Sequence, residues 1–321
     1  HASEPCIEMH PQELTRRRWQ AGDLVRVRSR RGALILPVQA SESVAPAQAF
    51  IAMHWGEEFV SGQDRQGQAL HGVNALCTPA YCPTSKQPEL KHTAVQVERV
   101  AELSWRLAGA AWIAPDQWMD RQQALRGCFQ AFAYAACVPF GREPDGRVGL
   151  LFRAAADAPA SSALVDRIEG LLGLDDPLAL RYADPRRGQR RAMRLGALPG
   201  APAESATLDG FLLAGDTAAQ DWVLALLKDG QPARGFGRAL LTNTANPLGV
   251  APRRGAQVCT CFDVREPEIL ATLARCQGNV DERLAQLQGQ LRCGTNCGSC
   301  LPALRKLVRT TDVALPTEDA A

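Results

Sequence analysis

The sequence of 321 residues lacks several features that would assign it to a class at once. No apolar run approaches the roughly twenty residues that a membrane-spanning helix needs, so we expect no membrane span. The first residues, His1 to Pro5, carry neither the basic nor the apolar segment of a secretory signal peptide. The formal net charge is only +2, which gives no support to a general role in binding nucleic acid. We therefore expect a soluble, cytoplasmic protein.

The sequence also lacks a methionine at its start, because it begins with His1. We interpret the chain as a fragment, or a processed chain, whose N-terminal portion is missing. We accordingly assign no catalytic residue within these 321 residues.

Cysteine is plentiful, and the eleven cysteines are an odd number. An odd count with a cluster of cysteines at one end argues against a disulfide framework and for a reducing compartment. The cysteines are therefore expected to be free thiols or metal ligands.

Two close pairs of cysteines lie near the C-terminus. Cys259 and Cys261 form a C-x-C pair, and Cys297 and Cys300 form a C-x-x-C pair. Each pair sits on a single turn and can present both thiolates to the same side, so the pattern predicts a metal or cluster site. Spacing alone leaves structural zinc open, although a C-x-C first pair is less usual for zinc ribbons. A further alternative is that these are free cysteines that pack in the core as small hydrophobic residues and bind no metal.

The residues around these pairs predict helices. Apolar residues recur at helical spacing from Val264 to Leu291, and Gly278-Asn279 breaks that run in two. A third amphipathic stretch, Leu301 to Val308, has Pro302 in its first turn. We expect a small all-helical domain over residues 256–310, with both cysteine pairs on its loops.

The two motifs together resemble a known family. The run V-C-T-C-F-D-V-R-E from Val258 and the run C-G-T-N-C-G-S-C-L-P from Cys293 resemble the bacterioferritin-associated-ferredoxin-like [2Fe-2S] domain. The resemblance implies a [2Fe-2S] cluster and leaves Cys276 and Cys293 outside the ligand set. The metal ligands that it implies are Cys259, Cys261, Cys297 and Cys300.

The N-terminal hundred residues read as β-rich. Leu24 to Ser29 alternates apolar and basic residues, as a half-buried strand should, and Ala33 to Val38 returns as a more buried strand. The pattern predicts a hairpin with an arginine-rich edge. Those arginines form either a solvated face or a surface that faces phosphates or another domain.

Several short motifs of this region occur in a specific order. They are His10-Pro11, Gly22-Asp23, Ser29-Arg-Arg-Gly32, Met53-His-Trp55, Val73-Asn74 and Ser85-Lys-Gln-Pro-Glu-Leu-Lys91. The order resembles the C-terminal molybdopterin-dinucleotide-binding domain of the bis-molybdopterin guanine dinucleotide oxidoreductases, with the closest likeness to bacterial assimilatory nitrate reductases. The resemblance implies a double-psi β-barrel over residues 1–98.

The same resemblance implies cofactor contacts. Asn74 and Lys91 match positions that contact the pterin cofactor in the family, and Trp55 falls in a segment near it. A carboxamide can pair with the amide-like edge of a pterin, and a lysine can neutralise a diphosphate. Cys82 departs from the family, which usually has an aspartate at this step.

The middle of the chain is less informative. We expect a helical connecting region over 99–175, with helical spacing in Ala101 to Ala114 and Gln117 to Ala136, a strand at Val148 to Phe152 and a helix at Ser161 to Leu172. Residues 176–245 weakly resemble the small α/β module found beside the ferredoxin-like domain in nitrite and nitrate reductases. Its basic turn, Asp184 to Arg191, is either solvated or a docking surface for an acidic electron donor.

Together the resemblances imply the C-terminal part of a molybdenum nitrate reductase, which reduces nitrate to nitrite. The implied cofactors are a [2Fe-2S] cluster and bis-molybdopterin guanine dinucleotide, with a [4Fe-4S] cluster only in the missing N-terminal domains. The implied partners are those domains and a flavoprotein reductase or ferredoxin as electron donor. Three alternatives stay open: another bis-pterin enzyme such as a formate dehydrogenase, a non-catalytic iron–sulfur electron-transfer or scaffold protein, and a zinc-stabilised nucleic-acid-binding module.

Overall fold

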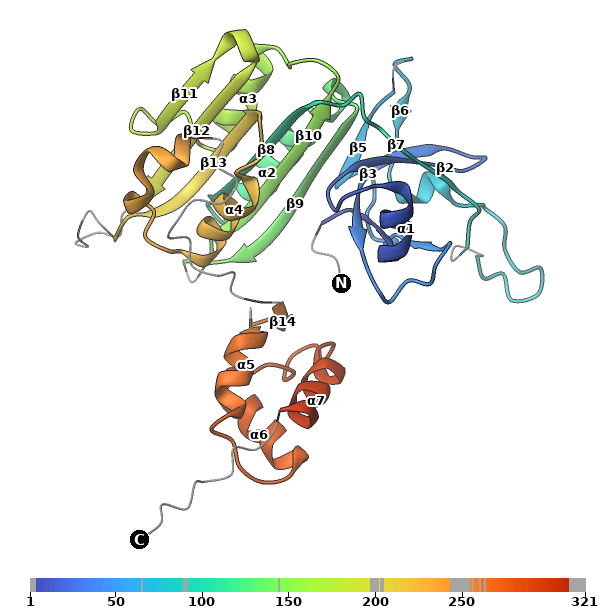
Figure 1. Ribbon diagram of the computed structural model, residues 1–321, viewed down its shortest axis with the longest axis vertical. Helices are drawn as coiled ribbons and strands as arrows, with labels where there is room; N and C mark the ends of the chain where they lie inside the picture. The colour runs from blue at the N-terminus through green and yellow to red at the C-terminus, as the bar shows by residue number, and fades with distance from the viewer. Residues whose placement is uncertain are drawn as a thin grey trace. The chain divides into compact units, whose positions relative to one another are not determined.

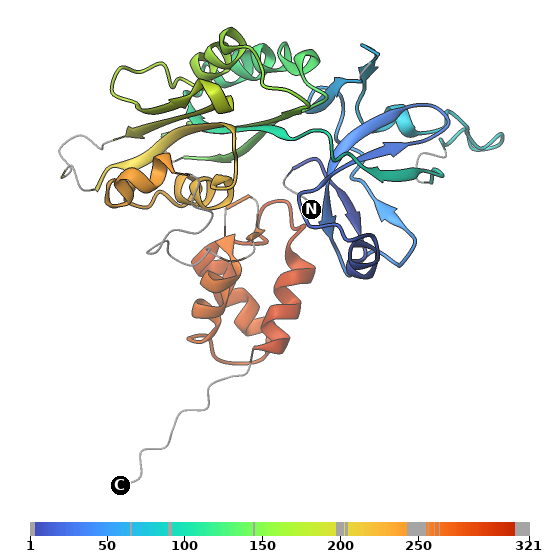
Figure 2. The ribbon, with the colours of Figure 1, turned by 45° about the horizontal axis from the view of Figure 1, so that its top comes forward.

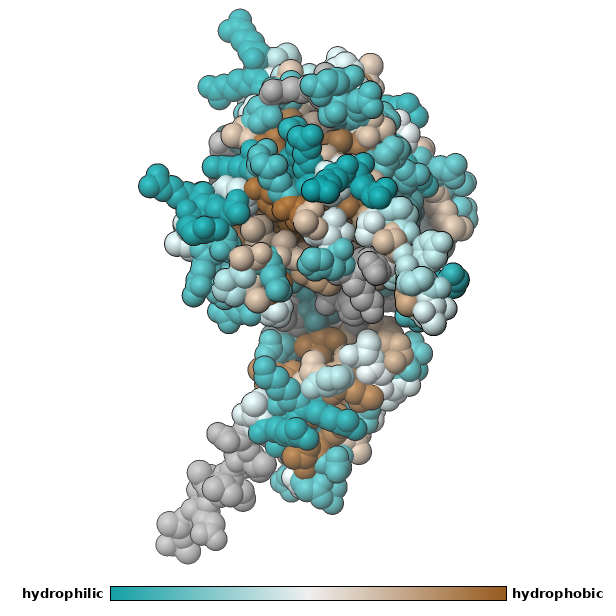
Figure 3. Space-filling view, turned by 90° about the vertical axis from the view of Figure 1, so that its right-hand side faces the viewer, coloured by the Kyte–Doolittle hydropathy of each residue, from teal (hydrophilic) through white to brown (hydrophobic). Residues whose placement is uncertain are grey.

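The computed structural model describes residues 4–64, 66–88, 92–143, 145–196, 202, 205–242, 255, 257–259, 261–262 and 264–311. Its contacts divide the chain into two units, His1–Val250 and Ala251–Ala321. No helix within the described ranges has the length and apolar character needed to cross a membrane. On the face in Figure 3, hydrophilic side chains surround smaller groups of hydrophobic ones on both units.

Five strands of the first unit form a mixed sheet in the order β4-β1-β3-β2-β7 (Figure 1). Their bounds are β1 Ile7–Met9, β2 Leu24–Arg28, β3 Ala33–Ala40, β4 Ala49–Phe50 and β7 Gln96–Arg99. Strands β2 and β3 form the predicted hairpin, with Val25 opposite Leu36, whereas β1 and β3 run parallel. This arrangement is compatible with part of a barrel, and the complete double-psi barrel stays a prediction.

A short helix and a single 3-10 turn complete this part. Helix α1, Pro11–Arg17, begins where the His10 ring accepts a hydrogen bond from the backbone N–H of Gln12 at 3.2 Å. The 3-10 helix η1, Val73–Leu76, follows strand β6. It carries Asn74 on its exposed side.

Eight strands form a larger antiparallel sheet in the order β11-β12-β13-β8-β10-β9-β5-β6. Their bounds are β5 Val60–Gln63, β6 Ala69–Leu70, β8 Trp105–Ile113, β9 Tyr134–Arg142, β10 Val148–Ala156, β11 Leu180–Asp184, β12 Gln189–Gly196 and β13 Thr207–Gly215. Strands β5 and β6 come from the N-terminal residues, and β13 pairs directly with β8. The ranges 99–175 and 176–245 therefore contribute strands to one continuous sheet.

Helices cover both faces of this sheet (Figure 2). Their bounds, with those of the 3-10 segments, are α2 Trp118–Arg126, η2 Phe129–Ala131, α3 Ser162–Leu171, η3 Pro185–Arg187, α4 Gln220–Asp229 and η5 Arg234–Leu241. Leu107 and Ala111 of β8 pack in the cluster that includes α2 and α3, whereas Ala110 and Trp112 pack in the cluster that includes α4. Strand β8 is therefore buried on both sides.

This double burial explains a wrong prediction. The expected helix over Ala101 to Ala114 is wrong, because Trp105–Ile113 forms strand β8. A strand that is apolar on both faces has no period of two, and a short apolar run cannot be told from a helix by periodicity. The predicted helix from Gln117 to Ala136 is confirmed only over Trp118–Arg126, since the chain is already in strand β9 at Tyr134. The predicted strand at Val148 and helix near Ser161 are confirmed as β10 and α3.

The described residues of the second unit form three helices and a two-stranded antiparallel sheet. Their bounds are β14 Gln257–Cys259, β15 Val264–Arg265, α5 Glu266–Leu273, α6 Val280–Leu291 and α7 Leu301–Thr310. The prediction of an all-helical domain is therefore corrected, because the first cysteine pair lies on a small β-hairpin. Asn279 caps α6 through hydrogen bonds to the backbone N–H groups of Asp281 and Glu282, which explains why the helical pattern breaks at this point.

Candidate functional sites

The four predicted cysteine ligands come from two turns of the second unit. Cys259 ends strand β14, and Cys261 lies in the turn that leads to β15. Cys297 lies in the loop between α6 and α7, and Cys300 caps the start of α7. Gly294 and Gly298 of that loop have φ angles of 82° and 73°, a left-handed conformation that glycine adopts without a steric penalty.

The thiols pair across the two motifs rather than within them. The Cys261 Sγ lies 3.3 Å from the Cys297 Sγ. Cys300 and Cys259 are also neighbours, since, after burial, interaction with Cys259 contributes to raising the pKa of Cys300. Each short motif therefore gives one sulfur to each pair, and the unit must be folded before either pair can form.

The two pairs differ in exposure. Cys259 and Cys300 are buried, with 2% and 5% of their surface exposed, whereas Cys261 and Cys297 are exposed. The site therefore has one inner pair of sulfurs and one outer pair that faces solvent.

The environment also sets the thiol acidities apart. A hydrogen bond from the Ser299 hydroxyl, 3.1 Å from the Cys297 Sγ, lowers the pKa of Cys297 to about 7. Burial, followed by the Cys259 contact, raises the pKa of Cys300 to about 11. The outer thiol of Cys297 thus ionises near neutral pH. The inner thiol of Cys300 stays protonated at this pH unless a metal ion binds the sulfur and displaces the proton.

Two further cysteines of this unit, Cys276 and Cys293, are buried. Cys293 is fully buried, and desolvation raises its pKa, with a smaller contribution from the nearby Cys259. The Cys276 thiol donates a hydrogen bond to the Thr272 carbonyl at 3.3 Å. That contact gives Cys276 a structural role at the C-terminal end of α5.

The arrangement of sulfurs fits a two-iron cluster. Two pairs of thiols match two metal ions that each take two thiolates, the coordination of a [2Fe-2S] cluster. A structural zinc ion would instead gather four ligands around one centre.

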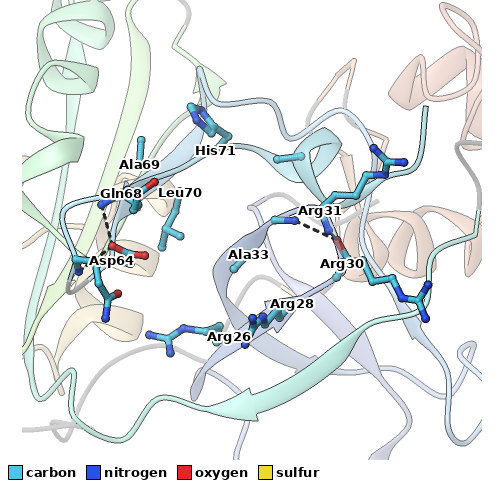
Figure 4. Close-up of a pocket in the computed structure, with 14 residues that line it drawn as sticks. Arg26, Arg28, Arg30, Arg31, Ala33, Asp64, Gln68, Ala69, Leu70 and His71 are labelled. Carbon is cyan, nitrogen blue, oxygen red and sulfur yellow. Dashed lines mark hydrogen bonds between the residues drawn. The ribbon is translucent and has the colours of Figure 1, made fainter.

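A second candidate site is a cavity of about 700 Å³ in the first unit (Figure 4). The β2–β3 hairpin lines one side of it and the β5–β6 hairpin the other, with Ala75 of η1 nearby. Figure 4 shows Arg26 extending toward the β5–β6 hairpin, whereas Arg30 and Arg31 extend away from it at the hairpin tip. The cavity joins segments about forty residues apart in the sequence.

The cavity is electrostatically positive. Four arginines line it, and within the described residues none of the four lies within ion-pair distance of a carboxylate. They are Arg26, Arg28, Arg30 and Arg31. The one carboxylate in the lining, Asp64, accepts hydrogen bonds from the backbone N–H groups of Gln66 and Gln68 at 2.9 and 2.8 Å. A phosphate group would therefore meet unpaired guanidinium groups here, which are suited to bidentate contacts with it.

The structure brings the segments of Trp55 and Asn74 together. The Val73 N–H donates a hydrogen bond to the Trp55 carbonyl at 3.0 Å, and a Cβ on Gly72 would lie only 2.4 Å from the backbone nitrogen of Glu57. Trp55 is buried, and its indole Nε1 has no hydrogen-bond partner within the described residues. An unpaired buried donor costs free energy unless a bound group satisfies it, so these residues fit an added polar ligand.

The other predicted positions stand differently. Lys91 lies outside the described residues. Cys82, the departure from the family pattern, lies in a turn where hydrogen bonds from Ser85 lower its pKa. The alternating V-R-V-R strand predicted the arginines on one side of the cavity. No motif in the sequence predicted the opposite side, which Gln68 and His71 help to line.

Comparison with known families confirms both resemblances. Residues 1–94 match the family described as molybdopterin dinucleotide binding domain, and residues 257–310 match the BFD-like [2Fe-2S] binding domain. The chain thus carries one domain for a molybdopterin dinucleotide and one for an iron–sulfur cluster. The second match favours iron and sulfide over zinc at the four cysteines.

Individual relatives point in the same direction. The chain is 28% identical over 315 residues to a nitrate reductase of Klebsiella oxytoca, an alignment that covers 96% of this chain and 30% of the relative. It is 40% identical over 73 residues to a nitrate reductase of Synechocystis sp., covering 23% of this chain and 9% of the relative. It is 31% identical over 98 residues to an F420-dependent formate dehydrogenase subunit alpha of Methanocaldococcus jannaschii, covering 30% and 13%. The chain spans less than a third of the length of each of these relatives.

Proposed function

We propose that this chain is the C-terminal part of the catalytic subunit of a cytoplasmic molybdenum nitrate reductase. The observation that carries the proposal is the similarity to a nitrate reductase over 96% of the chain, with both cofactor domains inside the aligned residues. The whole enzyme reduces nitrate to nitrite by two electrons. When bound, the molybdenum–pterin cofactor would supply the oxygen-transfer chemistry, and residues of the first unit would help to hold it.

The first unit contributes to the binding of the guanine dinucleotide form of the pterin. The arginine-lined cavity neutralises its diphosphate, because unpaired guanidinium groups give charge-assisted hydrogen bonds to phosphate oxygens. The carboxamide of Asn74 on η1 can both donate a hydrogen bond to the edge of the pterin and accept one from it. Lys91 adds a positive charge. Trp55 positions the segment through its carbonyl and offers its unpaired indole N–H.

The second unit relays electrons. Cys259, Cys261, Cys297 and Cys300 hold a [2Fe-2S] cluster that exchanges one electron at a time. The exposed pair marks the side on which an electron donor, a flavoprotein reductase or a ferredoxin, approaches. The buried pair, Cys259 and Cys300, keeps water away from the inner side of the cluster. Adding an electron to the cluster costs more free energy where water is excluded, so this burial influences the reduction potential.

A second candidate function is formate oxidation by a bis-pterin enzyme. The observation that favours it is the 31% identity over 98 residues to a formate dehydrogenase subunit. The two candidates share their cofactors and differ in the substrate, which the residues described here do not contact in either proposal.

The test is an assay of the full-length enzyme that contains this chain. With reduced methyl viologen as electron source, we expect nitrate-dependent oxidation of the viologen. One nitrite should form for every two electrons consumed. Formate-dependent reduction of the oxidised dye without nitrite formation would replace the first candidate by the second. Absence of both reactions in a protein that carries molybdenum and iron would contradict the two proposals together.

A further inference from the structure

Helix α7 presents a row of basic side chains on its solvent side. Arg305, Lys306 and Arg309 are exposed and, with Pro302 and Thr310, line a shallow cavity of about 460 Å³. The opposite side of the helix is buried in the core of the second unit through Leu304 and Val308. Positions three and four apart lie on the same side of a helix, so the three charges form one continuous stripe.

The structure describes no carboxylate that neutralises these charges. Within the described residues, none of the three basic side chains of α7 lies within ion-pair distance of a carboxylate. Helix α7 packs in the core through its buried residues Leu304 and Val308, and the residues of the stripe take no part in that packing. As far as the described residues show, this stripe of three charges is therefore available for a partner.

The stripe lies beside the sulfur site. Helix α7 begins directly after Cys300, and a rise of about 1.5 Å per residue places Arg305 roughly 7 Å along the axis from that cysteine. A fourth basic group lies close to the outer pair of sulfurs, because the Arg292 guanidinium stacks 4.8 Å from the ring of Phe262, the neighbour of Cys261. Basic residues thus lie near both cysteine motifs, Arg292 against Phe262 and the stripe on the helix that follows Cys300.

Those acidic residues of the same unit that the structure describes lie on the other two helices. They cluster in the first turns of α5 and α6, at Glu266, Glu268, Asp281 and Glu282. Two of them serve as capping residues, since Glu268 and Glu282 accept hydrogen bonds from the backbone N–H groups of Arg265 and Asn279. Among the described residues, the basic side chains of α7 are therefore on a different helix from the carboxylates, and a partner of opposite charge would recognise them.

We propose that Arg292 and the exposed stripe of Arg305, Lys306 and Arg309 form the docking surface for a small acidic electron-carrier protein. The inference rests on the proposed function, because it takes the cysteine site to be the electron acceptor. In the transfer, a reduced flavin hydroquinone anion in the carrier loses one electron to become the neutral semiquinone. The oxidised cluster gains that electron, and no bond forms or breaks.

The rival docking surface is the basic turn at η3 in the first unit. Arg186 and Arg187 are exposed there, and only Arg187 approaches a carboxylate, Asp184, at 3.8 Å. Reversing these two charges therefore makes a matched control for reversing those of α7. Both changes add acidic groups at exposed basic positions.

The experiment is stopped-flow reduction of the cluster-loaded protein by flavodoxin hydroquinone, whose acidic rim surrounds its flavin. For the unmodified protein we expect a second-order rate constant that falls as ionic strength rises. The variant R305E/K306E/R309E is expected to react about tenfold or more slowly at low ionic strength and to lose the salt dependence. The neutral variant R305Q/K306Q/R309Q should fall between the two. The control R186E/R187E should stay within about twofold of the unmodified protein.

Two further readouts separate the possible failures. Titration of oxidised flavodoxin into each protein measures the dissociation constant without electron transfer, and it should rise in parallel with the loss of rate. Reduction by dithionite, together with the iron and sulfide content, should be the same in all variants. Unchanged rates and affinities in the α7 variants, or a larger loss in the η3 control, would overturn the docking proposal. A protein with no iron and sulfide would contradict the proposed function itself.

Discussion

The sulfur atoms of Cys261 and Cys297 lie 3.3 Å apart although 36 positions separate the two residues in the sequence. The pairing of α5 and α6 in the core, through side chains such as Leu273 and Leu287, is what brings the two turns together. A site built from such distant turns does not exist in the unfolded chain, so metal binding and folding are coupled. The unit is therefore expected to unfold at a lower temperature when its cluster is removed.

Serine in place of any one of the four paired cysteines should disrupt the cluster. Cys261→Ser or Cys297→Ser removes an outer ligand, and Cys259→Ser or Cys300→Ser removes an inner one. Because serine is a poorer ligand for iron than a thiolate, we expect loss or marked change of the visible and EPR spectra. Iron per protein measured under anaerobic conditions checks this.

Cys276→Ser is the matched control for those changes. A serine hydroxyl can donate to the Thr272 carbonyl as the thiol does, so the cluster content should be unchanged. Cys293→Ser should also retain the cluster, at a cost in stability from burying a hydroxyl at a fully buried position. Loss of the cluster in Cys293→Ser, with retention in Cys297→Ser, would show that the ligand assignment is wrong.

The cluster-free protein should react with iodoacetamide first at Cys297. The lowered pKa of about 7 makes its thiolate abundant above neutral pH, whereas the pKa of about 11 and the burial of Cys300 keep that thiol protonated. Peptide mass spectrometry at pH 7.5 is expected to find Cys297 modified well before Cys300. Ser299→Ala removes the hydrogen bond that lowers the pKa of Cys297, so modification at this pH should slow.

Replacing Arg26 and Arg28 by glutamine should weaken the binding of GDP, a probe for the diphosphate of the cofactor. A charge-assisted hydrogen bond contributes about 1.5 kcal/mol before screening, so we expect the dissociation constant to rise about tenfold at low salt. Arg142→Gln is the control, because Arg142 is exposed but does not line the cavity. Equal affinities in calorimetric titrations of all three proteins would exclude the cavity as the diphosphate site.

Gly72→Ala should destabilise the first unit. A methyl group at this position would lie 2.4 Å from the Glu57 nitrogen, where backbone must move to make room. Overpacking of this kind costs about 1–3 kcal/mol, and it would separate η1 from the Trp55 segment. Gly235→Ala, where the added methyl meets no atom within 4 Å, should change the free energy of unfolding little. Denaturant titrations of both variants give the comparison.

The parts of the fold that the sequence predicted well are those with a one-sided pattern. Strand β2 alternates buried Val25 and Val27 with arginines that are more exposed, and this period of two is visible in the letters. The cap at Asn279 is equally local, since the residue and its partner Glu282 are three positions apart. Such signals depend on neighbours along the chain and need no knowledge of tertiary contacts.

The parts that could not be predicted depend on distant contacts. Strand β8 is apolar from Leu107 to Ile113 because α3 packs on one face and α4 on the other, and neither helix is adjacent to it in the sequence. The four cysteines were visible as two motifs, but the pairing of Cys259 with Cys300 and of Cys261 with Cys297 follows only from the folded core. The second wall of the arginine cavity likewise comes from a hairpin about forty residues further on.

The central claim is that the four paired cysteines hold a two-iron cluster in a protein of the molybdopterin class. The most direct measurement is the iron, acid-labile sulfide and zinc content of anaerobically purified protein, with its EPR spectrum before and after reduction. We predict about two irons and two sulfides per chain and a signal that appears on one-electron reduction. One zinc ion per chain, with no sulfide and no colour, would contradict the claim.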